Sequence, residues 1–284
     1  MAQILKGAPV AASLTEELTR RVSVLAERGI TPKLAIVRVG ERDDDLSYER
    51  GAEKRCAKVG IEVEKFLLPS DCSQQDLLDA IARVNADASI HGCLMFRPLP
   101  KTLDEQAACA ALDPAKDMDC ITEGSLFGVF AGRPKGFPPC TAEAVMELLR
   151  FYGYDLGGAN VTVIGRSLVI GKPVSMMLQA ANATVTMCHT KTRDVAAACK
   201  GSEVVVVAAG HMGTFDASCA APGQTVIDVG INWDESAGKL AGDVDFDAVE
   251  PIVSAITPVP GGVGSVTTAC LAKHVVEAAE RTVS

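Results

Sequence analysis

The chain has 284 residues, enough for one large domain or two domains of ordinary size. Hydrophobic residues make up 48% of the chain and charged residues 22%, as in a globular protein with a substantial core. The net charge of -9 and the aromatic content of 4% argue against nucleic acid or an anionic membrane surface as a partner.

The cysteines and histidines show no pattern of a metal site. None of the ten cysteines belongs to a C-x-x-C pair, and Cys93, Cys188 and Cys199 lie in or beside apolar segments. We therefore expect buried, reduced thiols in a cytoplasmic protein, and no bound metal. No apolar run approaches the length of a membrane span, and the first residues lack the design of a signal peptide.

The first half of the chain alternates short β-rich segments with amphipathic helical segments. In chain order we expect a helix near 12–29, a strand at 33–40, a helix near 47–59 that Ser47 could cap, a strand at 61–68, a helix near 73–86 and a strand at 91–97. Continuous apolar strands that alternate with helices are typical of parallel sheets covered on both faces.

A second series of the same kind follows the segment FPPCTAEAVMELLRFYG. Strands are expected at 160–165, 183–189, 203–210 and 224–230, with helices near 171–181 and 192–200 and a last helix from about 265 to 282. We therefore predict two α/β domains with parallel sheets, the second Rossmann-like. The expected domains are 1–140 together with 265–284, closed by the last helix, and 141–264.

The segment NVTVIGRSLVIGKP predicts a strand, a turn that opens with Gly165, and a helix that starts near Gly171. Glycine permits a tight turn, and the free N–H groups of a helix N-terminus attract phosphate. The spacing does not match G-x-G-x-x-G, so an ordinary strand-to-helix turn remains open as an alternative.

The next expected strand ends in CHTKTRD, where a fold specific for NAD usually places an acidic residue. Lys191 and Arg193 precede the first acid, and Arg166 belongs to the preceding turn. This basic group suits a 2′-phosphate, which favours NADP, although NAD and a merely solvated basic loop remain open.

Ordered blocks of sequence carry a resemblance that covers essentially the whole chain. The blocks are LKGAPVA, VGERDDDLSYERGAEKRCAKVGI, DPAKDMDCIT, PPCTAEAVMELL, GRSLVIGKP, TVTMCHTKT, VVVAAG, VIDVGIN, GDVDF and ITPVPGGVGSVTTACL. In order and spacing they resemble the methylenetetrahydrofolate dehydrogenase/cyclohydrolase family. This resemblance implies a homodimer whose subunit binds a tetrahydrofolate derivative in a cleft between an N-terminal domain and a Rossmann-like domain.

The resemblance also implies roles for individual residues. The residues that match the pyrophosphate turn are Gly165, Arg166, Ser167, Ile170, Gly171 and Pro173, and Thr190 matches a contact to the adenosine phosphate. The strand ends that would support the nicotinamide ring are Ala209, Gly210, Gly230 and Ile231. The expected folate-site residues are Tyr48, Phe96, Asp119, Pro260, Gly261, Gly262 and Val263, with Tyr48 and Asp119 in catalytic roles.

Simpler explanations exist for the two residues expected to be catalytic. A lone tyrosine on a helix is usually a packing residue whose hydroxyl reaches water. An aspartate in a loop often caps a turn. The matching blocks around Tyr48 and Asp119 favour the folate site in both cases.

The chain departs from the family pattern where proton transfer is expected. Ala52 stands where the family has the lysine of Tyr-x-x-x-Lys, and Lys54 is predicted on nearly the opposite helix face. Phe96 stands at the position of a glutamine that helps to hold this lysine in the family. Ser265 replaces a proline, and Cys120 replaces a glycine.

These departures affect the two family reactions unequally. Hydride transfer requires orientation and exclusion of water, whereas hydrolysis of a methenyl bridge requires proton transfer. We therefore predict NADP-dependent methylenetetrahydrofolate oxidation with weak or absent cyclohydrolase activity. Two alternatives are a fully bifunctional enzyme with rewired water activation, and a paralogue with a changed substrate or a non-catalytic binding role.

Overall fold

The computed structural model describes residues 1–133, 135–235 and 237–283. The chain divides into two compact units, which we treat separately. Unit 1 comprises Met1–Ala11 and Thr141–Thr267, and unit 2 comprises Ala12–Cys140 and Thr268–Ser284. The expected domain of residues 1–140 was therefore wrong for the first eleven residues, because strand β1 (Gln3–Ile4) pairs with β11 (Ala255–Ile256) of unit 1.

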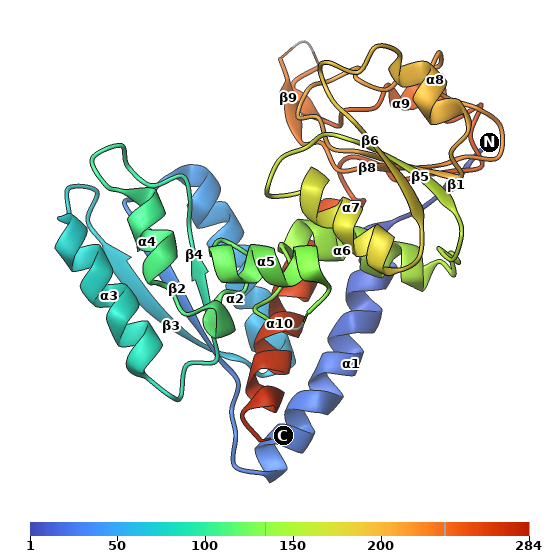
Figure 1. The fold of residues 1–284 in the computed structure, drawn as a ribbon. Coiled ribbons are helices and arrows are strands. Elements are labelled where there is room, and N and C mark those ends of the chain that lie inside the picture. The colour runs from blue at the N-terminus through green and yellow to red at the C-terminus, as the bar shows by residue number, and fades with distance from the viewer. Residues whose placement is uncertain (134, 236, 284) are drawn as a thin grey trace. The chain divides into compact units, whose positions relative to one another are not determined.

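Unit 1 contains a six-stranded parallel sheet (Figure 1). Its order is β1-β11-β8-β7-β5-β6, with β5 at Asn160–Ile164, β6 at Thr184–Cys188, β7 at Val204–Val207 and β8 at Thr225–Asp228. The chain runs from β5 outward to β6 and then returns to the other side of β5 as β7. The carboxyl ends of β5 and β7 therefore meet at a topological switch point, where open α/β sheets bind ligands.

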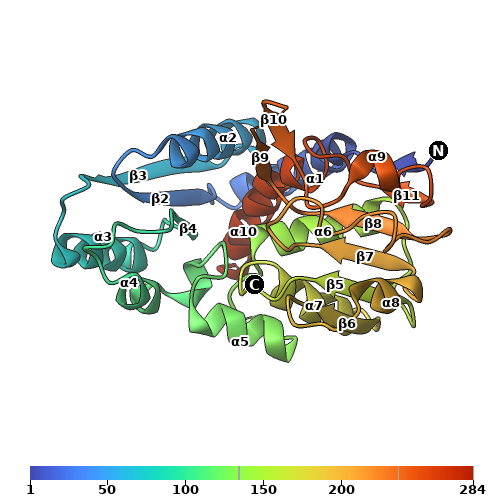
Figure 2. The same ribbon diagram turned by 90° about the horizontal axis from the view of Figure 1, so that it is seen from above.

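In unit 1, α7 (Gly171–Ala180) follows β5 and α8 (Val195–Lys200) follows β6, as predicted from the sequence. The unit also contains α6 (Cys140–Phe151, from its second residue), which precedes β5, and α9 (Phe246–Val249). An antiparallel hairpin of β9 (Asn232–Asp234) and β10 (Lys239–Ala241) extends the loop after β8, and a 3-10 turn spans Val263–Ser265. Figure 2 shows β5, β7 and β8 side by side in this unit.

Unit 2 contains a three-stranded parallel sheet in the order β3-β2-β4. The strands are β2 (Lys33–Val39), β3 (Glu62–Leu68) and β4 (Gly92–Met95), and the helices are α1 (Gly7–Glu27, which begins in unit 1), α2 (Asp43–Val59), α3 (Gln74–Ala86), α4 (Glu105–Ala111), α5 (Glu123–Ala131) and α10 (Thr267–Arg281). A 3-10 turn spans Pro114–Lys116. Helices α3 and α4 lie along one side of the sheet and α2 along the other (Figure 2).

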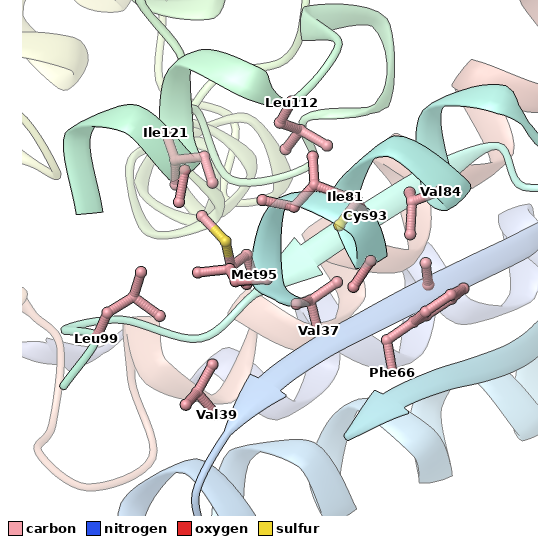
Figure 3. Packing of buried hydrophobic residues seen from close by; sticks show 14 of the residues in the cluster. Val37, Val39, Phe66, Ile81, Val84, Cys93, Met95, Leu99, Leu112 and Ile121 are labelled. Atoms are coloured by element: carbon pink, nitrogen blue, oxygen red, sulfur yellow. The ribbon is translucent and has the colours of Figure 1, made fainter. Parts of the chain in front are cut away.

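The core of unit 2 joins the sheet to α3 (Figure 3). Val37 of β2 and Met95 of β4 pack with Ile81 and Val84 of α3 in this cluster. Helix α3 buries positions 77, 80, 81 and 84, which is the spacing of one helix face. This packing fixes the carboxyl end of β4, from which the chain enters the candidate site.

Helix α2 begins four residues earlier than predicted, and the expected cap at Ser47 was wrong. Arg42 is the N-cap residue, and Asp43, Asp44 and Asp45 form an acidic first turn. Carboxylates stabilise a helix N-terminus because its peptide dipoles and free N–H groups carry partial positive charge. Ser47 lies inside the helix and is exposed.

The ten cysteines are free thiols, and nine of them are buried. Burial raises the pKa of Cys56, Cys93 and Cys199 to about 12, so these thiols stay protonated at neutral pH. Within the described residues, no helix is both long enough and apolar enough to cross a membrane.

Candidate active site

Helix α2 presents Tyr48 to Phe96, which directly follows β4. The two rings meet edge to face, with centroids 6.1 Å apart and an interplanar angle of 80°. Tyr48 is partly buried and Phe96 is 9% exposed. Ala52, one turn after Tyr48, is 0% exposed, whereas Lys54 is exposed, as its predicted position on the other helix face requires. The side chains of Ala52 and Phe96 carry no group that can exchange a proton.

A buried ion pair anchors the same helix to the sheet. Glu49 is adjacent to Tyr48, and its Oε2 lies 2.7 Å from Nε of Arg38 on β2. Both side chains are almost fully buried, and Lys65 of β3 approaches the second oxygen of Glu49 at 3.2 Å. Two strands therefore hold the turn of α2 that carries Tyr48.

We expect Glu49→Gln to lower the free energy of unfolding of the protein by about 3 kcal/mol, because Arg38 would keep a buried charge without its counter-ion. Urea denaturation followed by circular dichroism measures this loss. The control is Glu53→Gln, whose side chain is 34% exposed and pairs with Lys65 at 2.7 Å. That exposed pair should contribute less than about 1 kcal/mol. Equal losses in the two variants would contradict the account.

Asp119 lies in the loop between the 3-10 turn and α5. Its Oδ1 accepts a hydrogen bond of 2.8 Å from the N–H of Cys140, the first residue of α6. Burial raises the pKa of the Asp119 carboxyl, and the hydrogen bonds from Cys140 oppose this rise. Asp119 is therefore a carboxyl group with one fixed oxygen, in surroundings that favour its accepting or sharing a proton.

The backbone around Asp119 is held by Asp117, which is 0% exposed. Its Oδ1 accepts from the N–H groups of Ile121 at 3.0 Å and Asp119 at 3.3 Å, and its Oδ2 accepts from Thr122 at 2.8 Å. Cys120 adopts a φ of 60°, a conformation that L-residues other than Asn and Asp rarely take. This position is the one where the resemblance implied glycine, so the structure explains that preference.

His274 of α10 lies beside this loop and is 1% exposed. Its Nδ1 is 2.9 Å from the carbonyl oxygen of Met118, so Nδ1 carries the proton and donates it. Burial lowers the pKa of His274 to about 4. The hydrogen bond to Met118 and the charge of Asp117 oppose this fall, whereas the charges of Lys273 and Arg281 add to it. His274 is therefore neutral at physiological pH.

We expect His274 to make the protein less stable as the pH falls from 6.5 to 4. A histidine whose pKa is lower in the folded chain binds its proton more tightly in the unfolded chain. The free energy of unfolding therefore falls by roughly 3 kcal/mol between pH 6.5 and pH 4. Urea unfolding of wild type and His274→Asn at several pH values measures the difference. Burial raises the pKa of Asp228 to about 6, so this group makes both proteins more stable as the pH falls. Its contribution cancels when the two proteins are compared. Parallel stability curves would contradict this assignment.

In unit 1, the turn after β5 forms a close-fitting backbone cradle. Gly165 has a φ of 127°, and a Cβ at this position would overlap the carbonyl oxygen of Ala208. A Cβ at Gly171, the first residue of α7, would overlap the carbonyl oxygen of Gly165. Ser167 accepts a hydrogen bond of 3.1 Å from the N–H of Ile170. Glycine backbone at the N-terminus of a helix and at the switch point of the sheet fits a bound phosphate.

The loop after β6 presents exposed basic residues near the same edge of the sheet. The N–H of His189 donates to the Thr192 hydroxyl, and the N–H of Thr192 donates to the His189 carbonyl, which shapes the loop. Lys191 and Arg193 are exposed, as is Thr190. Asp194, the first acid after the strand, accepts from the N–H of Ala197 at 2.8 Å and caps α8. Its carboxylate is therefore engaged in a helix cap, which leaves the loop suited to a phosphate rather than to a ribose diol.

Two buried carboxylates organise the strand ends that were expected to support a nicotinamide ring. Asp243 Oδ2 accepts from the N–H groups of Ala209 at 2.7 Å and Gly210 at 2.8 Å. Asp228 Oδ1 accepts from the N–H groups of Gly230 at 2.9 Å and Asp243 at 3.0 Å. Gly230 has no Cβ that would overlap the carboxyl group of Asp243. The strand ends after β7 and β8 are thus tied to each other.

A pocket of ≈ 270 Å³ adjoins these strand ends within unit 1. Its walls include Gly230 and Ile231 together with Pro260, Gly261, Gly262 and Val263. The structure therefore brings two of the four expected ring-supporting residues, Gly230 and Ile231, and the expected loop residues to one cavity. Pro173 is buried in the first turn of α7, where it suits the helix start.

The structure thus groups most of the expected site residues locally. Tyr48 and Phe96 are in contact, and Asp119 belongs to the same unit, whereas the pocket and the phosphate cradle belong to unit 1. The sequence reasoning missed Asp117, Asp228, Asp243, His274 and the anchor of α2. Asp117, Asp228 and Asp243 lie inside the blocks DPAKDMDCIT, VIDVGIN and GDVDF, where an acid beside a turn was the available signal.

Comparison with known proteins identifies the family. Residues 5–119 match the model of the tetrahydrofolate dehydrogenase/cyclohydrolase catalytic domain, and residues 139–283 match that of its NAD(P)-binding domain. The chain is 52% identical over 276 residues to "Bifunctional protein FolD" of Clostridioides difficile (strain 630), a match that covers 97% of this chain and 96% of that protein. It is 51% identical over 281 residues to the protein of the same name from Carboxydothermus hydrogenoformans, covering 99% and 98%.

Solved structures agree with this match. The bifunctional FolD methylenetetrahydrofolate dehydrogenase/cyclohydrolase of Campylobacter jejuni gives a TM-score of 0.95 at 36% identity, covering 99% of this chain and 100% of that chain. The Trypanosoma brucei methylenetetrahydrofolate dehydrogenase-cyclohydrolase, complexed with NADP cofactor and inhibitor, gives 0.91 at 36% identity and covers 99% and 98%. The chain therefore belongs to the tetrahydrofolate dehydrogenase/cyclohydrolase family, with a two-domain α/β fold and a Rossmann-like NAD(P)-binding domain.

Proposed function

We propose that the protein oxidises 5,10-methylenetetrahydrofolate to 5,10-methenyltetrahydrofolate with NADP and hydrolyses the product weakly or not at all. The proposal that hydrolysis is weak or absent rests on Ala52 and Phe96, which lie beside Tyr48. One is a fully buried methyl group, and the other is a buried apolar ring in edge contact with the tyrosine. The resemblance places a lysine and a glutamine at these two positions.

The residues divide into those that bind and those that would move protons. NADP, when bound, supplies the acceptor of the hydride. The cradle of Gly165 and Gly171 would hold its pyrophosphate, and Arg166 and Thr190 its 2′-phosphate. The strand ends held by Asp243 would support the nicotinamide ring. These are orienting roles, and none requires a side chain to exchange a proton.

Hydrolysis makes a different demand on the folate side. Water must lose a proton as it attacks the methenyl carbon, and a positioned acid or base commonly contributes about two to four orders of magnitude. Tyr48 retains its phenol and Asp119 a carboxyl that accepts from Cys140, so we assign them to substrate binding and polarisation. Neither residue supplies the amine that the resemblance places at position 52.

The direct test measures the rate at which the purified enzyme forms NADPH from NADP and 5,10-methylenetetrahydrofolate. This rate is compared with the rate of NADH formation at the same concentration of NAD. We expect turnover with NADP to exceed turnover with NAD, because the loop after β6 has exposed basic residues and its first acid, Asp194, is engaged in capping α8. No reduction of either cofactor would refute the dehydrogenase, and a preference for NAD would refute only the choice of cofactor.

We expect Arg166→Ala to raise the KM for NADP by about 10- to 100-fold, because a charge-assisted contact to phosphate contributes about 1.5–3 kcal/mol. The KM for NAD should change little, since NAD lacks that phosphate. Lys200→Ala is the control, because Lys200 is exposed at the end of α8 and outside the matched positions. Equal effects of Arg166→Ala on both cofactors would contradict the assigned role.

A fully bifunctional enzyme is the second candidate, and the relatives favour it. Proteins 52% and 51% identical to this chain bear the name "Bifunctional protein FolD". In that case Tyr48 and an ordered water would replace the lysine. The cytoplasmic location and the homodimeric state expected from the sequence stay predictions.

A further inference from the structure

The buried His274 donates a hydrogen bond to the backbone next to Asp119, the residue to which we assign folate binding. His274 lies on α10, far along the chain from Met118, yet its Nδ1 is 2.9 Å from the Met118 carbonyl oxygen. The imidazole stacks on Phe137 with centroids 5.1 Å apart and an interplanar angle of 29°. The ring orientation is therefore fixed by one stacking contact and one hydrogen bond.

Cys140 also donates hydrogen bonds to Met118 and Asp119. Its thiol donates to the same Met118 carbonyl at 3.3 Å, and its backbone N–H donates to Asp119 Oδ1 at 2.8 Å. The Cys140 sulfur also lies 3.8 Å from His274 Nδ1. One carbonyl group and the neighbouring carboxylate are thus held by two residues that come from α6 and α10.

The opposite side of the same loop is held by Asp117, which binds the N–H groups of Asp119, Ile121 and Thr122. Asp117 restrains the loop mainly beyond Asp119, where Cys120 takes its left-handed conformation. Rotation of the Met118–Asp119 peptide would move the Asp119 side chain. The donors to the Met118 carbonyl oppose that rotation at one end of the peptide, and the bond of 3.3 Å from the Asp119 N–H to Asp117 opposes it at the other.

We propose that His274 is a positioning residue that orients Asp119, through the Met118 carbonyl, for binding of the folate substrate. The inference rests on the proposed function, because it takes Asp119 as a folate ligand. A carboxylate that must meet a planar heterocycle requires orientation to within a fraction of an ångström, and misplacement of this size costs affinity and rate. His274 itself is buried and acts only through the backbone.

The chemistry of the contact separates a positioning role from simple core filling. The carbonyl oxygen only accepts, so the side chain at 274 must donate from the place of Nδ1. The other ring nitrogen, Nε2, is buried without a hydrogen-bond partner among the described residues. This edge of the ring therefore fills space and makes no hydrogen bond there. Asparagine keeps an N–H near Nδ1, whereas leucine fills similar space without a donor.

The test compares His274→Asn with His274→Leu in steady-state assays of methylenetetrahydrofolate oxidation. We expect His274→Leu to raise the KM for the folate by about 10-fold and the KM for NADP by less than about twofold. His274→Asn should keep both constants within about threefold of wild type. Similar folate constants in the two variants, or a fall in active enzyme with unchanged KM, would overturn the positioning role.

Asp119→Ala separates failure of this inference from failure of the proposed function. If Asp119→Ala leaves the folate KM unchanged, the assignment of Asp119 is wrong and the inference falls with it. If Asp119→Ala raises the KM and His274→Leu does not, only the positioning role is wrong. We expect His274→Leu to add less than about twofold on the Asp119→Ala background, because residues that act as a unit are not additive. An independent, multiplicative effect would contradict action through Asp119.

If His274→Leu does not fold, His274→Ala tests the same point. The alanine variant should regain folate affinity when imidazole is added, because the free imidazole would fill the space beside Phe137 and donate to Met118. Recovery with imidazole but not with an apolar ring of similar size supports the donor. Equal recovery of folate affinity with both compounds would show that His274 only fills space in the core, which would overturn the positioning role.

Discussion

Replacing Ala52 by lysine together with Phe96 by glutamine is expected to raise the enzymatic hydrolysis of methenyltetrahydrofolate by about 100-fold or more. The double change restores an amine one helical turn from Tyr48 and an amide to receive it. Both parts are required, because position 52 is 0% exposed and an ammonium there is costly without a polar partner. The readout is loss of methenyl absorbance above the rate in buffer.

The matched control is Ala52→Met with Phe96→Gln, which fills the same space without an amine. This control should leave hydrolysis at the level of wild type, and so should Ala52→Lys alone. The dehydrogenase activity of each variant reports whether the folate site is intact. A double variant that oxidises methylenetetrahydrofolate normally, yet gains no hydrolysis, would show that our account of the missing step is incomplete.

Asp117→Asn is expected to lower the free energy of unfolding by about 3 kcal/mol. Both carboxylate oxygens of Asp117 accept from backbone N–H groups, on one side Ile121 and on the other Thr122. In either orientation, the amide NH₂ of asparagine would face one of these buried donors. Urea denaturation measures the loss, and the folate KM should rise as well because the loop carries Asp119.

Asp113→Asn provides the control for this substitution within the same segment. Asp113 is exposed, and its Oδ1 accepts from the N–H of Ala115 at 2.8 Å. Asparagine retains that acceptor, so stability should change by less than about 0.5 kcal/mol. A loss at Asp113 as large as that at Asp117 would mean that charge, rather than the number of buried donors, decides the effect.

Much of the fold could be predicted because strong local patterns coincide with the elements. The strand expected at 33–40 is observed at Lys33–Val39, and the helix expected near 73–86 is observed at Gln74–Ala86 with Ser73 as its cap. In both cases an apolar period or a capping residue marks the boundary. Helix α2 was placed late because its first turn, rich in aspartate, has no apolar period and is favoured by the helix dipole instead.

Elements and contacts that depend on distant partners could not be predicted. Strands β1 and β11 have two residues each, and their pairing joins Gln3 to Ala255 across nearly the whole chain. His274 shows no local signal, because its role depends on Met118, 156 residues away. The pairing of Asp243 with Ala209 and Gly210 is likewise visible only once the strands are side by side. The resemblance predicted the peptides of the site, and the structure identifies the residues that hold these peptides.

In this enzyme, hydride transfer is expected to persist where hydrolysis is impaired. The most direct measurement follows NADPH and methenyltetrahydrofolate together while the purified enzyme oxidises methylenetetrahydrofolate. We predict that both products accumulate at equal rates, with formyltetrahydrofolate appearing no faster than methenyltetrahydrofolate hydrolyses in buffer alone. Accumulation of NADPH with little methenyltetrahydrofolate, and formyltetrahydrofolate formed well above that rate, would contradict the claim.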